Sequence, residues 1–199
     1  MLPGEAAALI APLAVALGDP AGIGPEITAK AWERRATDAL PPFFAVGAPE
    51  ALRAVWGGPL QVFSCPDEAA SCFRESLPVI RIDAAGETQP GQPTLEGARN
   101  SLDALELAVG LTRSGASSAL VTGPVSKAQL YAIGFTHPGQ TEFIAERCGI
   151  AADMAAMMLA GDHSGDDLQA RVELTNELMF LSRGNPVVYY GDEQGFTGA

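Results

Sequence analysis

The sequence predicts an α/β fold of three layers, in which helices cover both faces of a mostly parallel β-sheet. Short apolar runs alternate with amphipathic segments along most of the 199 residues, as in proteins built from β–α units. Several runs stop at Gly or Pro, which are plentiful at 22 and 15 residues. Because strands of an interior parallel sheet are buried on both faces, they read as continuous apolar runs of this kind.

Seven segments are expected to be strands. The first, LAVAL at 13–17, ends in Gly18-Asp19-Pro20, and FFAVG at 43–47 has the same continuous apolar character. Runs of this length without alternating polarity indicate strands that are buried on both faces. The other candidates are LQVFS (60–64), PVIRID (78–83), SALVTG (118–123), MAAMMLAG (154–161) and the run 186–190.

The segments between these runs carry helix signals. Pro25 suits the first turn of a helix that extends to about Arg35. Residues 96–115 have apolar side chains at helical spacing and end on Gly115, which is a common stop residue. Further helices are expected at 49–57, 125–134, 141–149 and 168–184.

Composition bounds the partners and the compartment. Hydrophobic residues make up 47% of the chain, so a core is expected, and the formal charge is −12. A chain this acidic repels phosphate backbones and anionic membranes, so binding to nucleic acid or to a membrane is not expected. The apolar stretch at 6–17 follows Glu5 and contains Pro12, unlike a signal peptide.

The cysteines favour a reducing compartment. Cys65, Cys72 and Cys148 are an odd number and have no CxxC spacing. This pattern argues against a disulfide framework or a zinc knuckle. Reduced, partly buried thiols and a cytoplasmic location are therefore expected.

Three motifs follow predicted strands, and each has a structural and a functional interpretation. GDPAGIGPEI (18–27) could present backbone N–H groups to an anion, or simply join a strand to a helix; it is not the dinucleotide fingerprint G-x-G-x-x-G. In TGPVSK (122–127), Lys127 could meet a phosphate or carboxylate, or be an ordinary exposed lysine. In HPGQTE (137–142), Gln140 and Thr141 could donate to an oxygen-rich ligand, or Thr141 could only cap the next helix.

In this order, GDPAGIGPEI, ALVTGPVSK and GFTHPGQTEFIAE resemble the 4-hydroxythreonine-4-phosphate dehydrogenase family over about residues 10–161. The resemblance implies the N-terminal half of a two-lobed α/β/α fold similar to the isocitrate and isopropylmalate dehydrogenases. It implies a homodimeric oxidoreductase of pyridoxal phosphate biosynthesis that acts on a small phosphorylated substrate with NAD(P). It also implies a divalent metal (zinc, magnesium or cobalt) held by three histidines.

The resemblance implies substrate contacts at Gln140 and Thr141, and Lys127 is the third candidate. The family's G-H-T-E motif reads Gly139-Gln140-Thr141-Glu142 here, so Thr141 carries over and Gln140 stands in the place of His. Gln can donate a hydrogen bond, but it cannot become a cation or shuttle a proton.

No catalytic, cofactor-binding or metal-binding residue is assigned from the sequence. The family's metal-binding histidines lie downstream of the MMLA segment, and this chain has only two histidines, His137 and His163. Neither has a partner at a ligand spacing. Both are expected to be exposed loop histidines.

The pattern changes near residue 161. ELMFLSRGNPVVYYGDEQGFTG (177–198) resembles the last helix–strand unit of the α-amylase family of glycoside hydrolases, whose catalytic carboxylates come from earlier strands. The chain is therefore expected to be a chimera, with a truncated dehydrogenase-like lobe at 1–161 and an unrelated helix–strand tail at 162–199.

Three function classes stay open, beside the possibility that half of a two-lobed fold exposes apolar surface, aggregates and has no function. The first is NAD-dependent 4-hydroxythreonine-4-phosphate dehydrogenase, for which turnover by a truncated lobe without the metal ligands and the cofactor lobe is not expected. The second is a non-catalytic module that binds a phosphorylated ligand, or a fusion fragment, and binding without NAD reduction would identify the module. The third is an inactive glycoside hydrolase fragment.

Overall fold

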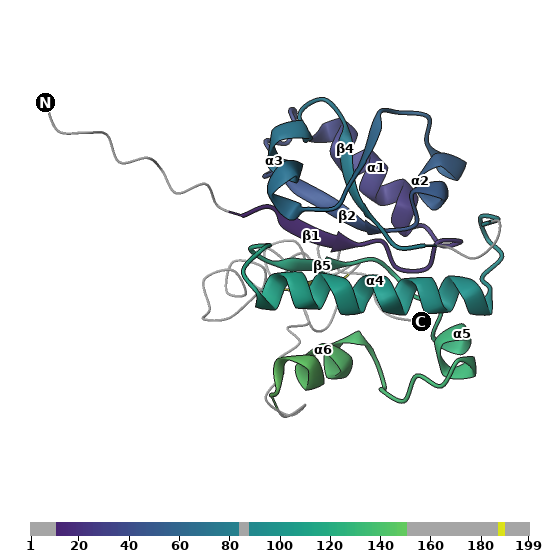
Figure 1. Cartoon of the computed structure of the whole chain (residues 1–199). Coiled ribbons are helices and arrows are strands. Elements are labelled where there is room, and N and C mark those ends of the chain that lie inside the picture. The colour runs from purple at the N-terminus through teal and green to yellow at the C-terminus, as the bar shows by residue number, and fades with distance from the viewer. Residues whose placement is uncertain (1–10, 84–87, 151–186, 190–199) are drawn as a thin grey trace, which may run out of the picture.

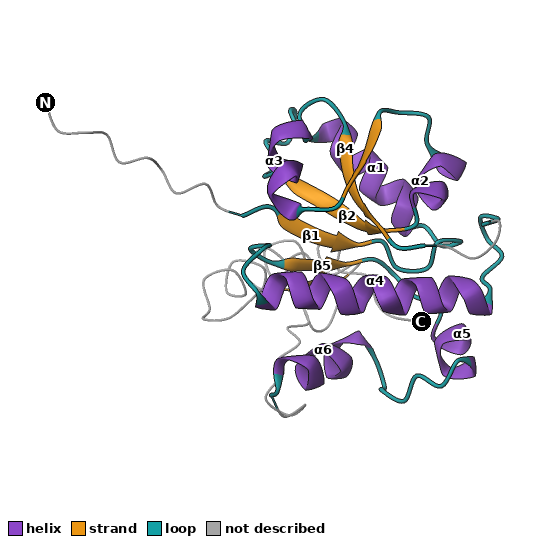
Figure 2. Ribbon diagram, in the orientation of Figure 1, coloured by secondary structure: helices purple, strands orange, loops and turns teal. Residues whose placement is uncertain are grey.

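The computed structural model describes residues 11–83, 88–150 and 187–189. Within these residues one sheet is formed, and every neighbouring pair of its strands is parallel. The three-layer α/β class predicted from the sequence is confirmed. The strands, orange in Figure 2, are β1 (Leu13–Ala16), β2 (Phe43–Gly47), β3 (Leu60–Phe63), β4 (Leu77–Arg81), β5 (Leu120–Thr122) and β6 (Val187–Tyr189).

The strand order β3-β4-β2-β1-β5-β6 places β1 near the middle of the sheet. Ala14 of β1 lies opposite Phe44 of β2 on one side and opposite Leu120 of β5 on the other. The strand that follows β1 in the chain is β2, which lies on the side of β1 away from β5. The strand that follows β5 in the described residues is β6, which lies on the side of β5 away from β1. The connections therefore diverge between β1 and β5. Ligands of α/β proteins bind beyond the carboxyl ends of the strands at such a switch point.

Helices cover both faces of the sheet. Figure 1 shows α1 and α2 on one side and the long helix α4 on the other, and α5 and α6 pack against α4. A short 3₁₀ turn (Pro66–Glu68) precedes α3. The helices are α1 (Gly24–Arg34), α2 (Pro49–Val55), α3 (Ala69–Cys72), α4 (Leu95–Arg113), α5 (Lys127–Ala132) and α6 (Gln140–Cys148).

The side chains of β2 explain why its sequence is apolar throughout. All five of its residues are buried. Phe43 and Ala45 join the core on the α1 and α2 side, and Phe44 and Val46 join the core on the α4 side. Successive strand residues point to opposite faces, so a strand that is covered on both faces needs no polar positions. The α4 side is completed by Ala104, Leu105, Ala108 and Val109 of α4 and by Phe143 of α6.

The helix predicted at 96–115 is confirmed as α4, and its start has a side-chain cap. The Thr94 hydroxyl oxygen accepts a hydrogen bond from the Gly97 N–H at 3.0 Å. This bond satisfies one of the N–H groups that have no partner within a helix. The helix expected to begin near Pro25 is also present, from Gly24 to Arg34.

One predicted helix cap is absent, and one short helical segment was not predicted. Thr141 does not cap α6, because the helix begins one residue earlier and Gly139 occupies the cap position with φ −163° and ψ −174°. The segment at 66–72, for which the sequence predicted no element, forms the 3₁₀ turn and α3. It is too short and too polar to show a helical period in the sequence.

Part of the predicted structure lies outside the described residues. This is so for the strand expected at 154–161, the helix expected at 168–184 and His163. The strand expected at 186–190 is present as β6, which pairs with β5 so that Val187 lies opposite Leu120. This segment, which follows the change of pattern near 161, therefore extends the sheet at the β5 edge.

Two further observations concern the surface. None of the described helices has both the length and the apolarity that crossing a membrane requires. All three cysteines are free thiols; Cys72 is half-buried, whereas Cys65 and Cys148 are exposed rather than partly buried as expected.

Candidate functional site

The candidate site lies where the loops after β1 and β5 meet, at the carboxyl edge of the sheet. The Asp19 N–H donates to the Pro124 carbonyl oxygen at 2.9 Å, and the Gly123 N–H donates to the Ala16 carbonyl oxygen at 2.7 Å. The first bond joins GDPAGIGPEI to TGPVSK, which are far apart in the sequence, and the second joins TGPVSK to the end of β1. Two motifs that were predicted separately therefore form one structure at the switch point of the sheet.

Two glycines allow close backbone approaches here, one between the two loops and one between α1 and the end of β1. Gly18 has a φ of +74°, in the left-handed region that glycine adopts without strain, and a Cβ there would overlap the Pro124 carbonyl oxygen. A Cβ on Gly24 would overlap the Leu17 carbonyl oxygen, because the first turn of α1 lies against the end of β1. Both glycines face the protein's own backbone. This favours the structural interpretation of the glycines over the anion-binding one.

Asp19 is a buried carboxylate within the same loop. It is only 4% exposed, and its Oδ1 accepts a hydrogen bond from the Ala21 N–H at 2.9 Å. Burial raises the pKa of this carboxyl above its ordinary value of 3.8, and the Ala21 N–H partly opposes that rise. The shift follows from the cost of removing a charge from water. Desolvated carboxyl groups near ligand sites are candidates for function.

Asp19→Asn should stabilise the fold near pH 7 more than it does near about pH 4. Because the folded-state pKa of Asp19 is raised, the fold favours the protonated carboxyl, and its contribution to stability falls as the pH rises through that pKa. Asn keeps the oxygen that faces Ala21 and has no charge to desolvate. The free energy of unfolding of both proteins should be measured by urea denaturation across this pH range.

The control for Asp19→Asn is Asp103→Asn, which removes an equal charge from an exposed position of α4. Removing any negative charge from a chain of net charge −12 reduces self-repulsion. Only the excess of the Asp19 effect over the Asp103 effect reports the buried carboxyl. Equal effects at every pH would contradict the prediction.

Gln140 enters the site from the start of α6, with its side chain only 6% exposed. Its Nε2 donates to the Gly123 carbonyl oxygen at 3.3 Å. A carbonyl oxygen can only accept, so the nitrogen of the amide must face Gly123 and the oxygen must face away. That oxygen, Oε1, is buried and has no hydrogen-bond partner among the described residues.

Thr122 provides a second buried polar atom without a partner. Its side chain is 4% exposed, and its Oγ1 has no hydrogen-bond partner within the described part of the chain. Thr122 precedes Gly123 in the chain, so both unpaired atoms flank the same stretch of backbone. A buried polar atom without a partner costs about 1–3 kcal/mol, and such atoms in folded proteins are normally paired. Within the described residues, both atoms therefore lack the partner that buried polar atoms normally have.

The two other predicted contacts lie in the first turns of α6 and α5. Thr141 follows Gln140 in the first turn of α6 and is partly buried. Lys127 is the first residue of α5, and its side chain is exposed, as expected of an ordinary surface lysine. Of the three predicted contacts, Gln140 is the one whose side chain has a hydrogen bond to the loop after β5 among the described residues.

His137 is not the exposed loop residue that was expected. Its side chain is 19% exposed, and its Nε2 lies 3.3 Å from Glu146 Oε2. The ring also packs against Phe135 and Phe143, with centroid distances of 5.2 and 5.4 Å. The sequence could not reveal this packing, because it depends on how α6 folds back over the loop before it.

The described residues do not fit the metal that the family resemblance implies. Within 11–83, 88–150 and 187–189, no group of three or more His, Cys, Asp or Glu side chains could hold a metal ion. His137 is already packed between aromatic rings and paired with a carboxylate. No described residue is therefore assigned to a metal.

Comparison with known proteins identifies the family. The family model of the pyridoxal phosphate biosynthetic protein PdxA matches residues 40–175, well over half of the chain. The chain belongs to the PdxA family. The match includes the loop after β5 and the Gln140 region, so both lie within the part of the chain that the family shares.

Individual PdxA relatives cover the same region. A 4-hydroxythreonine-4-phosphate dehydrogenase of Zymomonas mobilis is 56% identical over 75% of this chain, and one of Erythrobacter litoralis is 47% identical over 75%. The chain spans only 45% and 46% of the lengths of these two relatives. The crystal structure of a 4-hydroxythreonine-4-phosphate dehydrogenase of Klebsiella pneumoniae matches with a TM-score of 0.61 and 30% identity, covering 68% of this chain and 43% of that one.

Sequence reasoning did not single out Asp19 and Thr122 as site residues. Thr122 is the last residue of an apolar strand and Asp19 lies in the turn that follows another, and these positions are the only signal the sequence contains. Such residues are common in turns, where they serve as local caps. Their burial is decided by the meeting of the two loops, so the structure was needed to distinguish them.

Proposed function

We propose that this chain provides a substrate-binding lobe of an NAD-dependent 4-hydroxythreonine-4-phosphate dehydrogenase. Its membership of the PdxA family and the printed name of its relatives support the activity. The observation that carries the site is the buried pair Gln140 Oε1 and Thr122 Oγ1, which have no partner among the described residues and lie at the switch point of the sheet. We propose that a polar ligand at this edge supplies the partners that these atoms lack.

The orientation of Gln140 supports a particular kind of contact. Its nitrogen is used by Gly123, so the group offered to a ligand is the acceptor Oε1. The matching group on the substrate is a donor, such as an ammonium or a hydroxyl, and 4-phosphohydroxythreonine carries both. The Thr122 hydroxyl can donate or accept and so can bind either the same group or its neighbour.

The remaining features of the family enter as parts of the same proposal. Bound NAD would accept a hydride from the alcohol of the substrate. We assign no described residue to the binding of NAD or of the divalent metal. Thr141 and Lys127 are proposed as further substrate contacts. A homodimer and a cytoplasmic location complete the proposal, and the three free thiols fit a reducing compartment.

The division of the chain is also a proposal. We infer a truncated dehydrogenase-like lobe at 1–161 and an unrelated helix–strand tail at 162–199, whose strand β6 pairs with β5, from the change of sequence pattern near residue 161. The family match runs on to residue 175, so its last part overlaps the tail. Limited proteolysis tests the division: a stable fragment that ends near residue 161 is expected, and first cleavage well within 1–161 would oppose it.

The first test is a calorimetric melt with and without 4-phosphohydroxythreonine. Binding to the folded chain should raise the midpoint temperature, and a ligand at about 100 times its Kd adds about 2.7 kcal/mol of stability. Inorganic phosphate is the control for simple anion binding. NADH formation in the presence of NAD and zinc or magnesium then separates a dehydrogenase from a binding module. A midpoint that the substrate does not move would overturn the proposal.

Variants of Gln140 give the sharper prediction. Gln140→Leu should weaken substrate binding about five-fold or more, since one hydrogen bond is lost at a buried position. Gln140→His keeps an N–H for Gly123 and, while neutral, an acceptor nitrogen for the substrate. Below about pH 6.5 the ring becomes a cation without an acceptor, so its affinity relative to the wild type should fall. Affinities of the variant and the wild type should be measured by isothermal titration calorimetry at the same pH values. The ionisation of the ligand then affects both proteins equally and drops out of the comparison.

The matched control is Gln61→Leu, on β3 at the far edge of the sheet, which should leave the affinity unchanged. If acid instead tightens binding to the Gln140→His protein, position 140 faces an anionic group of the ligand, and the donor assignment is wrong. If neither Gln140 variant changes the affinity, Gln140 does not contact the substrate.

A further inference from the structure

The loop that delivers Gln140 to the site is held at two points. The Tyr131 hydroxyl of α5 donates to the Pro138 carbonyl oxygen at 3.2 Å. The second point is His137, whose Nε2 lies 3.3 Å from Oε2 of Glu146 in α6. Gly139, which follows, is extended and has no side chain to hold it. The path into Gln140 therefore depends on the contacts of the two residues before Gly139.

His137 is anchored by packing as well as by its ion pair. Its ring is edge-on to Phe143, at 5.4 Å and 84°, and the Phe135 ring lies 5.2 Å from it. Phe143 is 2% exposed and belongs to the core that α6 shares with α4. The imidazole thus rests on two aromatic rings, one of which is fixed in the core.

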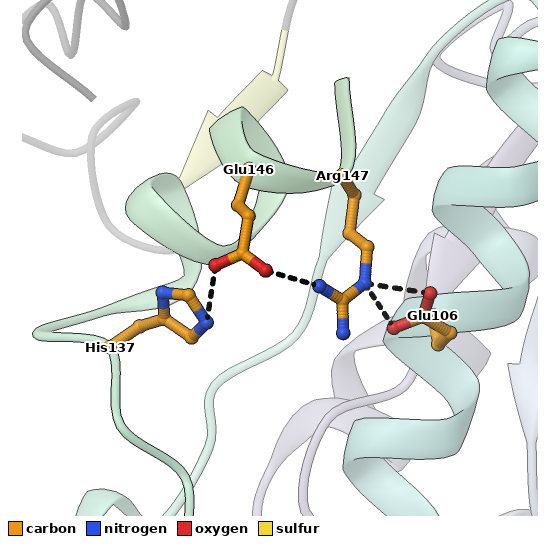
Figure 3. A network of polar contacts seen from close by, with 4 residues as sticks. All are labelled: Glu106, His137, Glu146 and Arg147. Atoms are coloured by element: carbon orange, nitrogen blue, oxygen red, sulfur yellow. Dashed lines mark hydrogen bonds and ion pairs between the residues drawn. The ribbon is translucent and has the colours of Figure 1, made fainter. Parts of the chain in front are cut away.

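Charged groups extend this anchor to the rest of the fold. Figure 3 shows that one oxygen of Glu146 lies beside His137 Nε2, at 3.3 Å, and that the other accepts from Arg147 at 2.9 Å. Arg147 Nε also contacts both carboxylate oxygens of Glu106 on α4, at 2.8 and 2.7 Å. The guanidinium lies 4.5 Å over the Phe143 ring. The position of Glu146, and hence the rotation of the His137 ring, is tied to α4.

The side chain of Gln140 has only a weak hydrogen bond to hold it among the described residues. Its one hydrogen bond within the described residues is the 3.3 Å contact with Gly123, near the long end of the range for N–H···O bonds. A long, single bond does not by itself fix the rotation of a carboxamide with several rotatable bonds. We therefore expect the backbone at 137–139, which the contacts of His137 hold, to influence the orientation of Oε1.

We propose that His137 is a positioning residue: it holds the 137–139 loop so that Gln140 turns its Nε2 to Gly123 and its Oε1 to the substrate. The identity of the ligand in this inference rests on the proposed function. The effect of His137 on the position of Gln140 does not. The ion pair is partly exposed, and such pairs contribute little to stability. His137 should therefore influence the Gln140 side chain and ligand affinity more than it influences the midpoint temperature.

The test uses His137→Phe, which retains an aromatic ring but has no N–H for Glu146, and His137→Gln, whose amide nitrogen can reach a similar position. The first readout is the side-chain amide resonance of Gln140 in a ¹H–¹⁵N spectrum, assigned by its absence in Gln140→Leu. The second is the affinity for 4-phosphohydroxythreonine. We expect His137→Phe to shift the resonance and weaken binding about five-fold, the size of one hydrogen bond, and His137→Gln to restore both.

Glu106→Gln is the matched control, because it weakens the far end of the network and leaves the His137–Glu146 contact in place. It should lower the midpoint temperature at least as much as His137→Phe does, without moving the Gln140 resonance. An unmoved resonance in His137→Phe, or an equal shift in Glu106→Gln, would overturn the inference. If the wild type does not bind the substrate, the proposed function fails, while the resonance still decides the role of His137.

Discussion

Gly24→Ala should lower the free energy of unfolding by about 3 kcal/mol, at the upper end of the range for an overpacked site. The added Cβ would overlap the carbonyl oxygen of Leu17 and approach the Leu17 carbonyl carbon at 3.1 Å. Both are backbone atoms, so no change of rotamer relieves the overlap. The first turn of α1 must move away from β1, and urea denaturation measures the cost.

Two other glycines serve as controls for Gly24→Ala. Gly110 lies in α4 with no atom within 4 Å of an added Cβ, so Gly110→Ala should stabilise the protein by about 0.5–1 kcal/mol. Gly115 is equally open but has a φ of +81°, so its substitution by Ala isolates backbone strain of about 1–2 kcal/mol. A loss at Gly24 no larger than the loss at Gly115 would show that α1 can shift without cost.

The same substitution should weaken the site. The loop after β1 is bonded to the loop after β5 through Asp19 and Pro124, and Gln140 is bonded to that second loop through Gly123. A displacement of α1 is therefore transmitted to the backbone that Gln140 contacts. Stability and ligand affinity should both fall in Gly24→Ala, whereas in Gln140→Leu the loss of affinity should be the larger change.

Phe143→Ala should destabilise the chain by about 3–5 kcal/mol, the usual cost of deleting a buried phenylalanine ring. Phe143 is 2% exposed and joins α6 to the core on the α4 side. Its ring also contacts Phe135, with centroids 5.7 Å apart, and lies beneath the Arg147 guanidinium. Its removal leaves a cavity and deprives His137 of one of its two aromatic supports.

Hydrogen exchange can locate the effect of Phe143→Ala. We expect the amides of α6 to lose protection first, since α6 is a short helix that depends on packing for its stability. Ile150→Ala is the control, because Ile150 follows α6 and is 49% exposed; it should change stability by about 0.5 kcal/mol or less. Protection of α6 that survives Phe143→Ala would mean that other contacts hold this helix.

Local physics was sufficient to predict most of the elements. The run FFAVG predicts a strand because a parallel strand covered on both faces has no polar position, and β2 is fully buried. Pro25 predicts the start of α1 because its fixed φ suits the first turn of a helix. These signals act within a few residues of one another, so they can be read before the fold is known.

The tertiary structure alone decided which of these residues meet. The sheet order brings β1 beside β5, and only then do Asp19 and Gly123 form one edge. The family resemblance pointed to Gln140, but its burial against Gly123 depends on that order. His137 was expected to be exposed and is instead packed against Phe143, because α6 folds back over it. The local sequence was sufficient to determine most helices and strands of this protein. The site was determined by contacts between distant segments, because a buried polar group needs neighbours that the local sequence does not specify.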